Sequence, residues 1–269
     1  FYVFYVKKIF FYYRYNNLNM EVKWIENKEK FDENLIKKIC KEFEIDSIFA
    51  KILLKRRYKS KKEIENFLKP RLENLHCPFD MKDMDIAVDK IINTIKENKI
   101  IMIYGDYDVD GVCSVSMMIY FFESLGKKVD FYIPNRFEEG YGISKKGIDH
   151  AIEKNISLII ALDCGTKDFE SIDYAKKNNI EIIVCDHHDV SEKFPESFAF
   201  LNPKRFDCKY PFKELSGCGV GFKLLQAICL KKNLENKYFL NLIDFVAIST
   251  CCDIVPMIGE NRILVNFGF

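Results

Sequence analysis

Residues 100–111 are IIMIYGDYDVDG, an apolar run followed at once by three aspartates and a glycine, and this stretch decides the fold. A short apolar run that ends in turn residues is typical of a buried strand. Comparable runs follow it at VDFYIP (129–134), SLIIALDCG (157–165) and IEIIVCDHH (180–188). Helical stretches separate these runs, at VSMMIYFFESL (115–125), GIDHAIEK (147–154) and SIDYAKKN (171–178). This alternation predicts an α/β fold with a parallel, doubly wound sheet covered on both faces.

The region before this alternation has a helical pattern. Apolar residues recur three and four positions apart in FDENLIKKICKEF, SIFAKILLKRRY, SKKEIENFL and MDIAVDKIINTIKEN. Ser60 and Glu63 have the Ser-x-x-Glu spacing of a capping box, so a helix should begin there. We therefore expect a helical N-terminal segment over 20–98 and an α/β domain over 99–269.

Residues 1–19 differ from the rest of the chain. They lack an initial Met and contain five of the 14 tyrosines but no Asp or Glu. Lys7, Lys8 and Arg14 interrupt the apolar residues well short of the ~20 needed to cross a bilayer. We interpret this stretch as a non-native or disordered upstream extension, with Met20 as the natural start.

Composition limits the ways in which the chain could bind nucleic acid. Lys and Arg total 41 against 40 Asp and Glu, a formal charge of +1, so the whole chain offers phosphates no general electrostatic attraction. Any contact with DNA must come from a local groove. The ten cysteines are scattered and include no Cys-x-x-Cys pair, which favours reduced thiols in the cytoplasm over disulfides.

Acidic and histidine residues follow the apolar runs. In open parallel sheets, ligands bind beyond the carboxyl ends of the strands. Four apolar segments, the fourth being FVAIS (245–249), are followed by such residues: Asp106, Asp108, Asp110, Asp163, Asp186, His187, His188 and Asp253. We expect these side chains to converge at one edge of the sheet.

Several of these residues have the chemistry of a metal site. Asp108 and Asp110 are two apart, which in an extended segment puts both carboxylates on one side, where they repel unless a cation neutralises them. Solvated acids in a loop are the alternative, and Asp163 could instead cap the helix after it. His187 and His188 are two of only four histidines. Imidazole with carboxylates suits Mn²⁺ or a related divalent ion better than structural zinc.

A glycine-containing loop precedes a further apolar helix at LSGCGVGFK (215–223). Ser216, Gly217 and Gly219 could present backbone N–H groups and a helix N-terminus to a phosphate. The segment matches neither the G-x-x-x-x-G-K-S/T loop nor the dinucleotide fingerprint.

Five motifs in order resemble those of the DHH phosphoesterase family: GDYDVDG, LDCG, CDHH, LSGCGVGFK and CCDIVPMIGENR. The stretches IPNRFEEGYGIS and LNPKRFDCKYPFKELSG extend the resemblance over nearly all of 20–269, and they are most similar to its bacterial single-strand-specific 5′→3′ DNA exonucleases. The resemblance implies a metal-dependent phosphodiesterase of DNA repair and recombination that uses two Mn²⁺ or Mg²⁺ ions. Their implied ligands are Asp108, Asp110, Asp163, His187 and Asp253, with Asp163 as the bridge.

The resemblance also implies catalytic roles for two further residues. His188 would contact the scissile phosphate, and Asp106 would support the metal ligands without itself binding an ion. Arg136 resembles a contact to the phosphate backbone. Further residues placed along the nucleic-acid path are Ser216, Gly217, Gly219, Lys223 and Arg262, and Lys204 and Arg205 are additional basic candidates.

The implied partner is single-stranded DNA, with a single-strand-binding protein and a helicase possible beside it. We expect a cytoplasmic monomer without a membrane role. The family continues beyond the position of Phe269 into a DHH-associated and an oligonucleotide-binding domain, which we therefore expect to be absent here. Two alternatives stay open: a DHH enzyme for small substrates such as oligonucleotides or pyrophosphate, and a catalytically inactive scaffold. Activity on long single-stranded DNA would distinguish the exonuclease from the small-substrate enzyme. The chain keeps every acidic residue expected to bind metal, which argues against an inactive scaffold.

Overall fold

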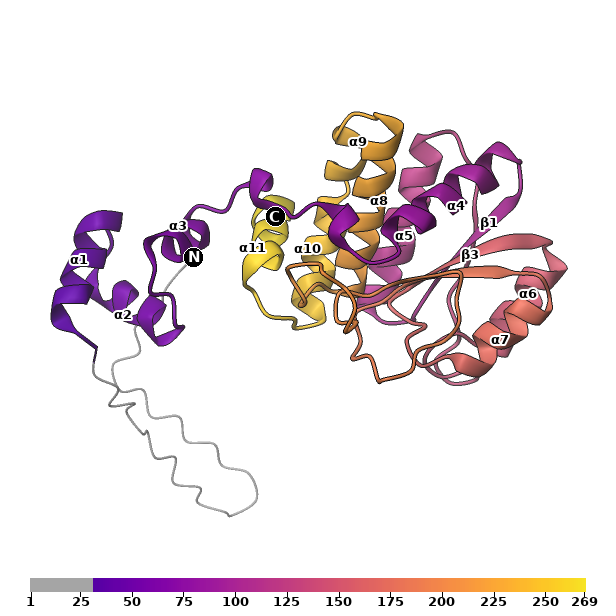
Figure 1. Ribbon diagram of the computed structural model, residues 1–269, viewed down its shortest axis with the longest axis horizontal. Coiled ribbons are helices and arrows are strands. Elements are labelled where there is room, and N and C mark those ends of the chain that lie inside the picture. The colour runs from indigo at the N-terminus through magenta and orange to yellow at the C-terminus, as the bar shows by residue number, and fades with distance from the viewer. Residues whose placement is uncertain (1–30) are drawn as a thin grey trace, which may run out of the picture. The chain divides into compact units, whose positions relative to one another are not determined.

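Five strands form one parallel sheet in the computed structural model, which describes residues 31–269 (Figure 1). Their order across the sheet is β2-β1-β3-β4-β5. Their bounds are β1 Ile100–Gly105, β2 Asp130–Tyr132, β3 Ile156–Leu162, β4 Glu181–Cys185 and β5 Ala199–Leu201. All four expected strands are present, whereas β5, only three residues long, was not predicted. The chain runs from β1 outward to β2 and returns on the other side of β1 as β3, so the topological switch point lies between β1 and β3.

Helices cover both faces of this sheet, as the sequence predicted (Figure 1). Alternate residues of a strand point to opposite faces. Ile101 and Ile103 join a core with helices α4 (Met84–Lys96), α5 (Val109–Ser124) and α8 (Gly217–Lys232). Met102 and Tyr104 join a second core with α6 (Lys145–Glu153) and α7 (Phe169–Lys177). The expectation of a doubly wound α/β fold is therefore confirmed.

Three helices complete the C-terminal part: α9 (Lys237–Leu240), α10 (Ile243–Cys252) and α11 (Gly259–Gly268). Helix α10 packs against α5, α8 and α11. The apolar segment FVAIS lies inside α10. It therefore delivers Asp253 from the end of a helix, and the grouping of this segment with the strands was wrong.

The chain divides into two compact units at Lys59/Ser60. The described part of the first contains α1 (Glu33–Phe43) and α2 (Ser47–Lys55). The second begins with α3 (Lys61–Leu68), where Ser60 and Glu63 form the expected capping box, and continues through the short helices η1 (Leu72–Asn74) and η2 (Pro78–Asp80). Helix α4 belongs to this second unit because its apolar face joins the core of the sheet. The division thus falls well before the expected boundary at 98/99.

The expectation for residues 1–19 lies outside the described residues. Within 31–269, the helices are too short or too polar for any of them to cross a membrane.

Candidate metal centre

Three neighbouring strands each end in a buried aspartate. Asp106 follows β1, Asp163 follows β3 and Asp186 follows β4, and each is at most 2% exposed. Because β1, β3 and β4 are adjacent and parallel, their carboxyl ends bring the three carboxyl groups to one edge of the sheet. This edge contains the switch point between β1 and β3.

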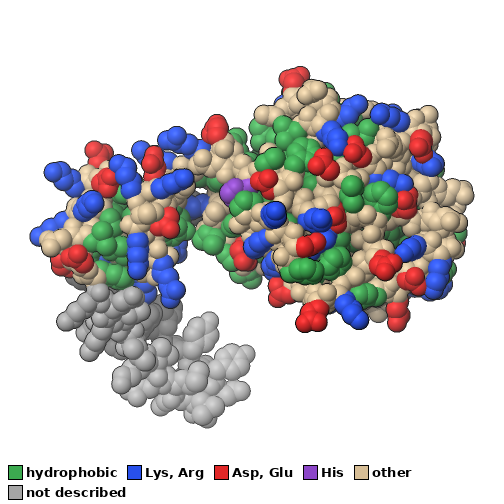
Figure 2. All heavy atoms as spheres, in the orientation of Figure 1, with side chains coloured by type: hydrophobic (Ala, Val, Ile, Leu, Met, Phe, Trp, Pro, Cys, Tyr) green, Lys and Arg blue, Asp and Glu red, His purple; other side chains and the backbone are tan. Residues whose placement is uncertain are grey.

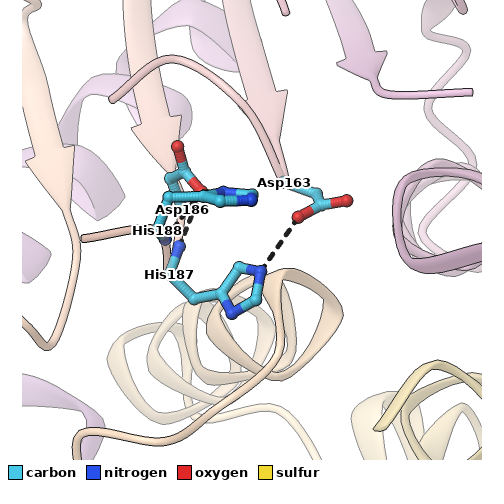
Figure 3. A group of neighbouring side chains, drawn as sticks. All are labelled: Asp163, Asp186, His187 and His188. Atoms are coloured by element: carbon cyan, nitrogen blue, oxygen red, sulfur yellow. Dashed lines mark hydrogen bonds and ion pairs between the residues drawn. The ribbon is translucent and has the colours of Figure 1, made fainter. Parts of the chain in front are cut away.

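The His187 ring stands among three carboxylates from different elements. Its Nε2 lies 3.2 Å from Asp163 Oδ1, 3.6 Å from Asp253 Oδ2 and 3.7 Å from Asp110 Oδ2. Figure 3 shows the ring directed toward Asp163. Residues 110 and 253 come from α5 and from the end of α10, so convergence is confirmed for these four residues.

These groups fit a metal ion. His187 Nε2 and Asp253 Oδ2 are buried and lack a hydrogen-bond partner in the described part of the chain. Burial, followed by the charges of Asp110 and Asp108, raises the pKa of Asp163 far above its usual value. Ligand atoms lie within 4.8 Å of one another in two overlapping groups: Asp110, His187 and Asp253; and Asp163, Asp186, His187 and His188. A divalent cation relieves the repulsion of such carboxylates, and these oxygen and imidazole donors suit Mn²⁺ or Mg²⁺.

Asp108 and Asp110 take their positions from the start of α5. Asp108 is the N-cap and accepts the Gly111 backbone N–H at 3.0 Å, so the expected extended segment is in fact a helix start. A side chain at 111 would place its Cβ 2.2 Å from the Asp106 carbonyl oxygen, which explains the glycine. Burial is the main cause of the raised pKa of Asp163 and of Asp253, and the charge of the exposed Asp108 adds to it in both cases.

The N-terminus of α8 holds Asp110 in place. The Asp110 carboxylate accepts the N–H groups of Gly217 at 2.6 Å and Cys218 at 2.8 Å, and the Ser249 hydroxyl at 2.6 Å. Ser216, Gly217 and Gly219 are buried, and Gly219 donates its N–H to Ser216 Oγ. Ser216 Oγ in turn lies 2.8 Å from Ser249 Oγ. The structure therefore directs the local donors of these three residues to other protein groups, and phosphate binding by them stays a prediction. Ser249 had no sequence signal, since it lies 139 positions from Asp110.

His188 is held from two sides. Its Nδ1 lies 2.7 Å from Asp186 Oδ1, and the hydrogen bond raises the pKa of His188. Burial alone would raise the pKa of Asp186, but His188 and the Thr166 N–H hold it below its ordinary value. The Tyr141 hydroxyl donates to the Asp163 carbonyl oxygen at 2.8 Å and lies 3.1 Å from His188 Nδ1. Sequence reasoning assigned no role to Tyr141, although it lies in the IPNRFEEGYGIS stretch.

Comparison with known families gives this arrangement a context. A family model described as "DHH family, N-terminal domain" matches residues 100–250. The chain belongs to the DHH family. The single-stranded-DNA-specific exonuclease RecJ of Bacillus subtilis is 38% identical over 237 residues, which cover 88% of this chain and 29% of that protein. RecJ of Haemophilus influenzae is 33% identical, over 87% of this chain and 43% of that protein.

Solved structures agree. A crystal structure of exonuclease RecJ bound to manganese has a TM-score of 0.65 and 30% identity, covering 74% of this chain and 49% of that one. The resemblance to RecJ expected from the motifs is therefore confirmed. This DHH chain spans 29% and 43% of the length of the two curated relatives.

Asp163, Asp106 and two buried cysteines lie at the ends of the strands in the DHH domain. Asp163 does not cap the following helix, because the N-cap of α7 is Asp168. Both Asp106 carboxylate oxygens are buried without a hydrogen-bond partner of normal geometry among residues 31–269, although nearby N–H groups moderate the charge. Burial raises the pKa of Asp106 to about 6. Cys164 and Cys185 are fully buried, and burial raises the pKa of both thiols, which does not suit a nucleophile.

Two basic residues that were expected to contact DNA, Lys223 and Arg262, instead contact other groups of the protein. Lys223 is 0% exposed, and its Nζ lies 2.8 Å from Glu260 Oε1, so its ammonium group cannot reach DNA without rearrangement and that expectation is wrong. The Arg262 guanidinium lies 3.7 Å from the centre of the Phe67 ring and donates to the Phe67 carbonyl oxygen.

The other three candidates differ in availability. Arg205 is 5% exposed and pairs with Asp83 and Asp207. Lys204 pairs with Asp189 at 3.1 Å. Arg136 is exposed, and its guanidinium lies 5.3 Å from the ring centre of Tyr107, between Asp106 and Asp108 in the sequence. Of the five, Arg136 is the one placed beside the candidate metal centre with its charge at the surface.

Proposed function

We propose that this chain is the catalytic part of a metal-dependent phosphodiesterase that degrades single-stranded DNA as an exonuclease. The observation that carries the proposal is the approach of His187 Nε2 to within 3.7 Å of Asp110, Asp163 and Asp253. The similarity to single-stranded-DNA-specific exonucleases supports the choice of substrate.

The residues proposed to hold two Mn²⁺ or Mg²⁺ ions are Asp108, Asp110, Asp163, His187 and Asp253. Such a pair supplies an activated water and neutralises charge on the attacking and leaving oxygens. The protein's own contribution is orientation. The hydrogen bond to Asp186 raises the pKa of His188 and so favours its protonated form. The His188 side chain is 40% exposed, and a protonated ring can donate to a phosphate oxygen. The proposed role of the exposed Arg136 is to pair with a phosphate of the strand.

The finer features of the proposal come from the motif resemblance: digestion from the 5′ end, a role in DNA repair and recombination, a cytoplasmic location and a monomeric state. A single-strand-binding protein and a helicase are the proposed partners.

The test uses single-stranded oligonucleotides labelled at either the 5′ or the 3′ end, incubated with Mn²⁺, with Mg²⁺ or with EDTA. Release of mononucleotides from the 5′ end, dependent on the metal, supports the proposal. Hydrolysis confined to dinucleotides or pyrophosphate would favour the small-substrate alternative. No hydrolysis of any of these with either metal would favour the scaffold.

A further inference from the structure

Residues 47–62 contain seven Lys or Arg and no Asp or Glu, in a chain whose formal charge is only +1. The basic residues are Lys51, Lys55, Arg56, Arg57, Lys59, Lys61 and Lys62. Neither the metal centre nor the cores of the sheet use the part of this run that follows α2. Lys and Arg side chains are prominent on the first unit in Figure 2.

The basic residues in the middle of this run are exposed, and they follow a turn of α2 that is packed in the protein. Lys55, Arg56 and Arg57 are exposed, and within the described residues none of them forms an ion pair. The preceding turn of α2 is fixed by the buried Leu53 and Leu54. A stable helix end thus presents three adjacent cations to solvent.

Arg57 adopts a backbone conformation that is unfavourable for arginine. Its φ is +67°, and the N–H of Tyr58 bonds to the Leu53 carbonyl oxygen at 3.1 Å, which is the geometry of a helix C-terminus that favours glycine. Cations at a helix C-terminus interact well with its dipole, which accounts for Lys55 or Arg56 alone. It does not account for an arginine with a strained backbone that directly follows two other cations, Lys55 and Arg56.

The second unit has the opposite charge. Residues 60–269 carry 27 Lys and Arg against 32 Asp and Glu. Lys223 and Arg205 are buried in ion pairs there. A polyanion is therefore attracted weakly by the unit that holds the metal centre, because non-specific binding depends on free basic side chains.

We propose that Lys55, Arg56 and Arg57 bind the phosphate backbone of the single-stranded substrate, as an anchor outside the metal centre. The inference rests on the proposed function, which supplies the polyanion. Adjacent arginines can grip phosphate oxygens in a bidentate manner, and the release of counterions from the strand drives such binding without regard to sequence. A phosphate backbone would also neutralise the three adjacent cations Lys55, Arg56 and Arg57.

The experiment measures fluorescence anisotropy of a labelled oligothymidylate with the full 269-residue chain, in EDTA, across 50–200 mM salt. The test variant carries Lys55→Gln, Arg56→Gln and Arg57→Gly. The matched control carries Lys37→Gln, Lys38→Gln and Lys41→Gln, which removes three exposed cations of α1 from the same unit. The test variant should bind about tenfold more weakly at 50 mM salt, and its log–log salt slope should be shallower by about 2, at about 0.7 per lost contact. An unchanged slope, or equal losses in test and control, overturns the proposal.

The single variant Arg57→Gly tests whether a loss of DNA affinity results from unfolding. Glycine relieves the positive φ, so the melting temperature should hold or rise while affinity falls severalfold. Full affinity in this variant overturns the anchor. Sedimentation with phosphatidylserine vesicles tests the rival polyanion: vesicle binding that the triple variant loses, with DNA binding unchanged, would assign the run to a membrane surface. Because binding is read without metal, failure of hydrolysis would contradict only the proposed function.

Discussion

At the residue scale, Asp163 has a strained backbone conformation and lies close to several other carboxyl groups. Its φ is +60°, which aspartate and asparagine tolerate better than most residues, and its carboxylate faces His187. Other buried acids surround it, including Asp110 and Asp186. A position that is unfavourable for both backbone and charge is retained where it serves a site, here as the proposed bridge between two ions.

Asp163→Asn should reduce hydrolysis of single-stranded DNA by about 10³-fold or more, because a bridging carboxylate contributes to both metal positions and several kcal/mol correspond to that factor. Without metal, the variant should unfold at the same urea concentration or a higher one, since the amide replaces a group whose charged form burial and its acidic neighbours already disfavour. Asp163→Ala should lose activity to the same degree but with some loss of stability, because alanine tolerates the positive φ less well. Near-normal turnover in Asp163→Asn would remove this residue from the metal centre.

At the element scale, the N-terminus of α8 positions two of the proposed ligands. Its first N–H groups bind Asp110. A Cβ at position 217 would lie 2.6 Å from the Cβ of Asp163, so glycine lets the helix end approach the bridge. The dipole of α8 also favours a negative charge at this end.

Gly217→Ala should therefore lower the catalytic rate by about 10²-fold, because displacing a catalytic group by about 1 Å can cost that much. Gly221→Ala in the same helix is the matched control. Its Cβ would meet the methyl ends of Leu162 and Met117 at 3.0 and 3.3 Å, which can move, so the rate should stay near that of the wild type. Similar rates for the two variants would show that the approach of α8 does not position Asp163. Steady-state kinetics on a short single strand measures both.

A buried polar network joins α8 to α11. Lys223 Nζ binds Glu260 and donates to the His76 carbonyl oxygen at 2.8 Å, and Tyr210 donates to Glu260 from the other side. Burial lowers the pKa of Lys223, while Glu260 opposes that shift. The His76 N–H also donates to Glu260 at 2.9 Å, which connects residues 184 positions apart in the sequence.

Lys223→Met should destabilise the fold by about 3–5 kcal/mol, because it leaves Glu260 buried without its cation. Urea unfolding measures the loss. Lys231→Met on the same helix is the control and should change the midpoint little, since Lys231 pairs at the surface with Asp89. A small loss in Lys223→Met would mean that Glu260 takes up a proton or water at little cost.

At the scale of the whole molecule, metal and fold should be coupled. The proposed ligands come from α5, β3, β4 and the end of α10, so they meet only in the folded chain. Ions that bind the folded state alone stabilise it by mass action. Mn²⁺ at 100 times its dissociation constant should add about 2.7 kcal/mol to the free energy of unfolding, and EDTA should reverse the gain. Calorimetry with and without Mn²⁺ measures the effect, and an equal gain in Asp163→Asn would place the ion elsewhere.

The sequence alone determined the sheet and most of the site. Apolar runs that end in acids have a local cause, because a buried parallel strand needs β-formers throughout and its carboxyl end must be polar. That is why the sequence pattern alone could place Asp106, Asp163 and His187 at the carboxyl ends of the strands. The motifs then indicated the family through residues that the chemistry needs.

Tertiary structure alone decided which polar groups remain available. Lys223, Ser216 and Gly217 have the residue types of a phosphate site, yet packing commits them to Glu260, Gly219 and Asp110. FVAIS resembles a strand by composition, but α10 forms because that segment packs against α5, α8 and α11. A short apolar run suits a strand or a buried helix equally well, and a polar group has several possible partners. Contacts between residues more than 100 positions apart select among these, and no local pattern encodes them.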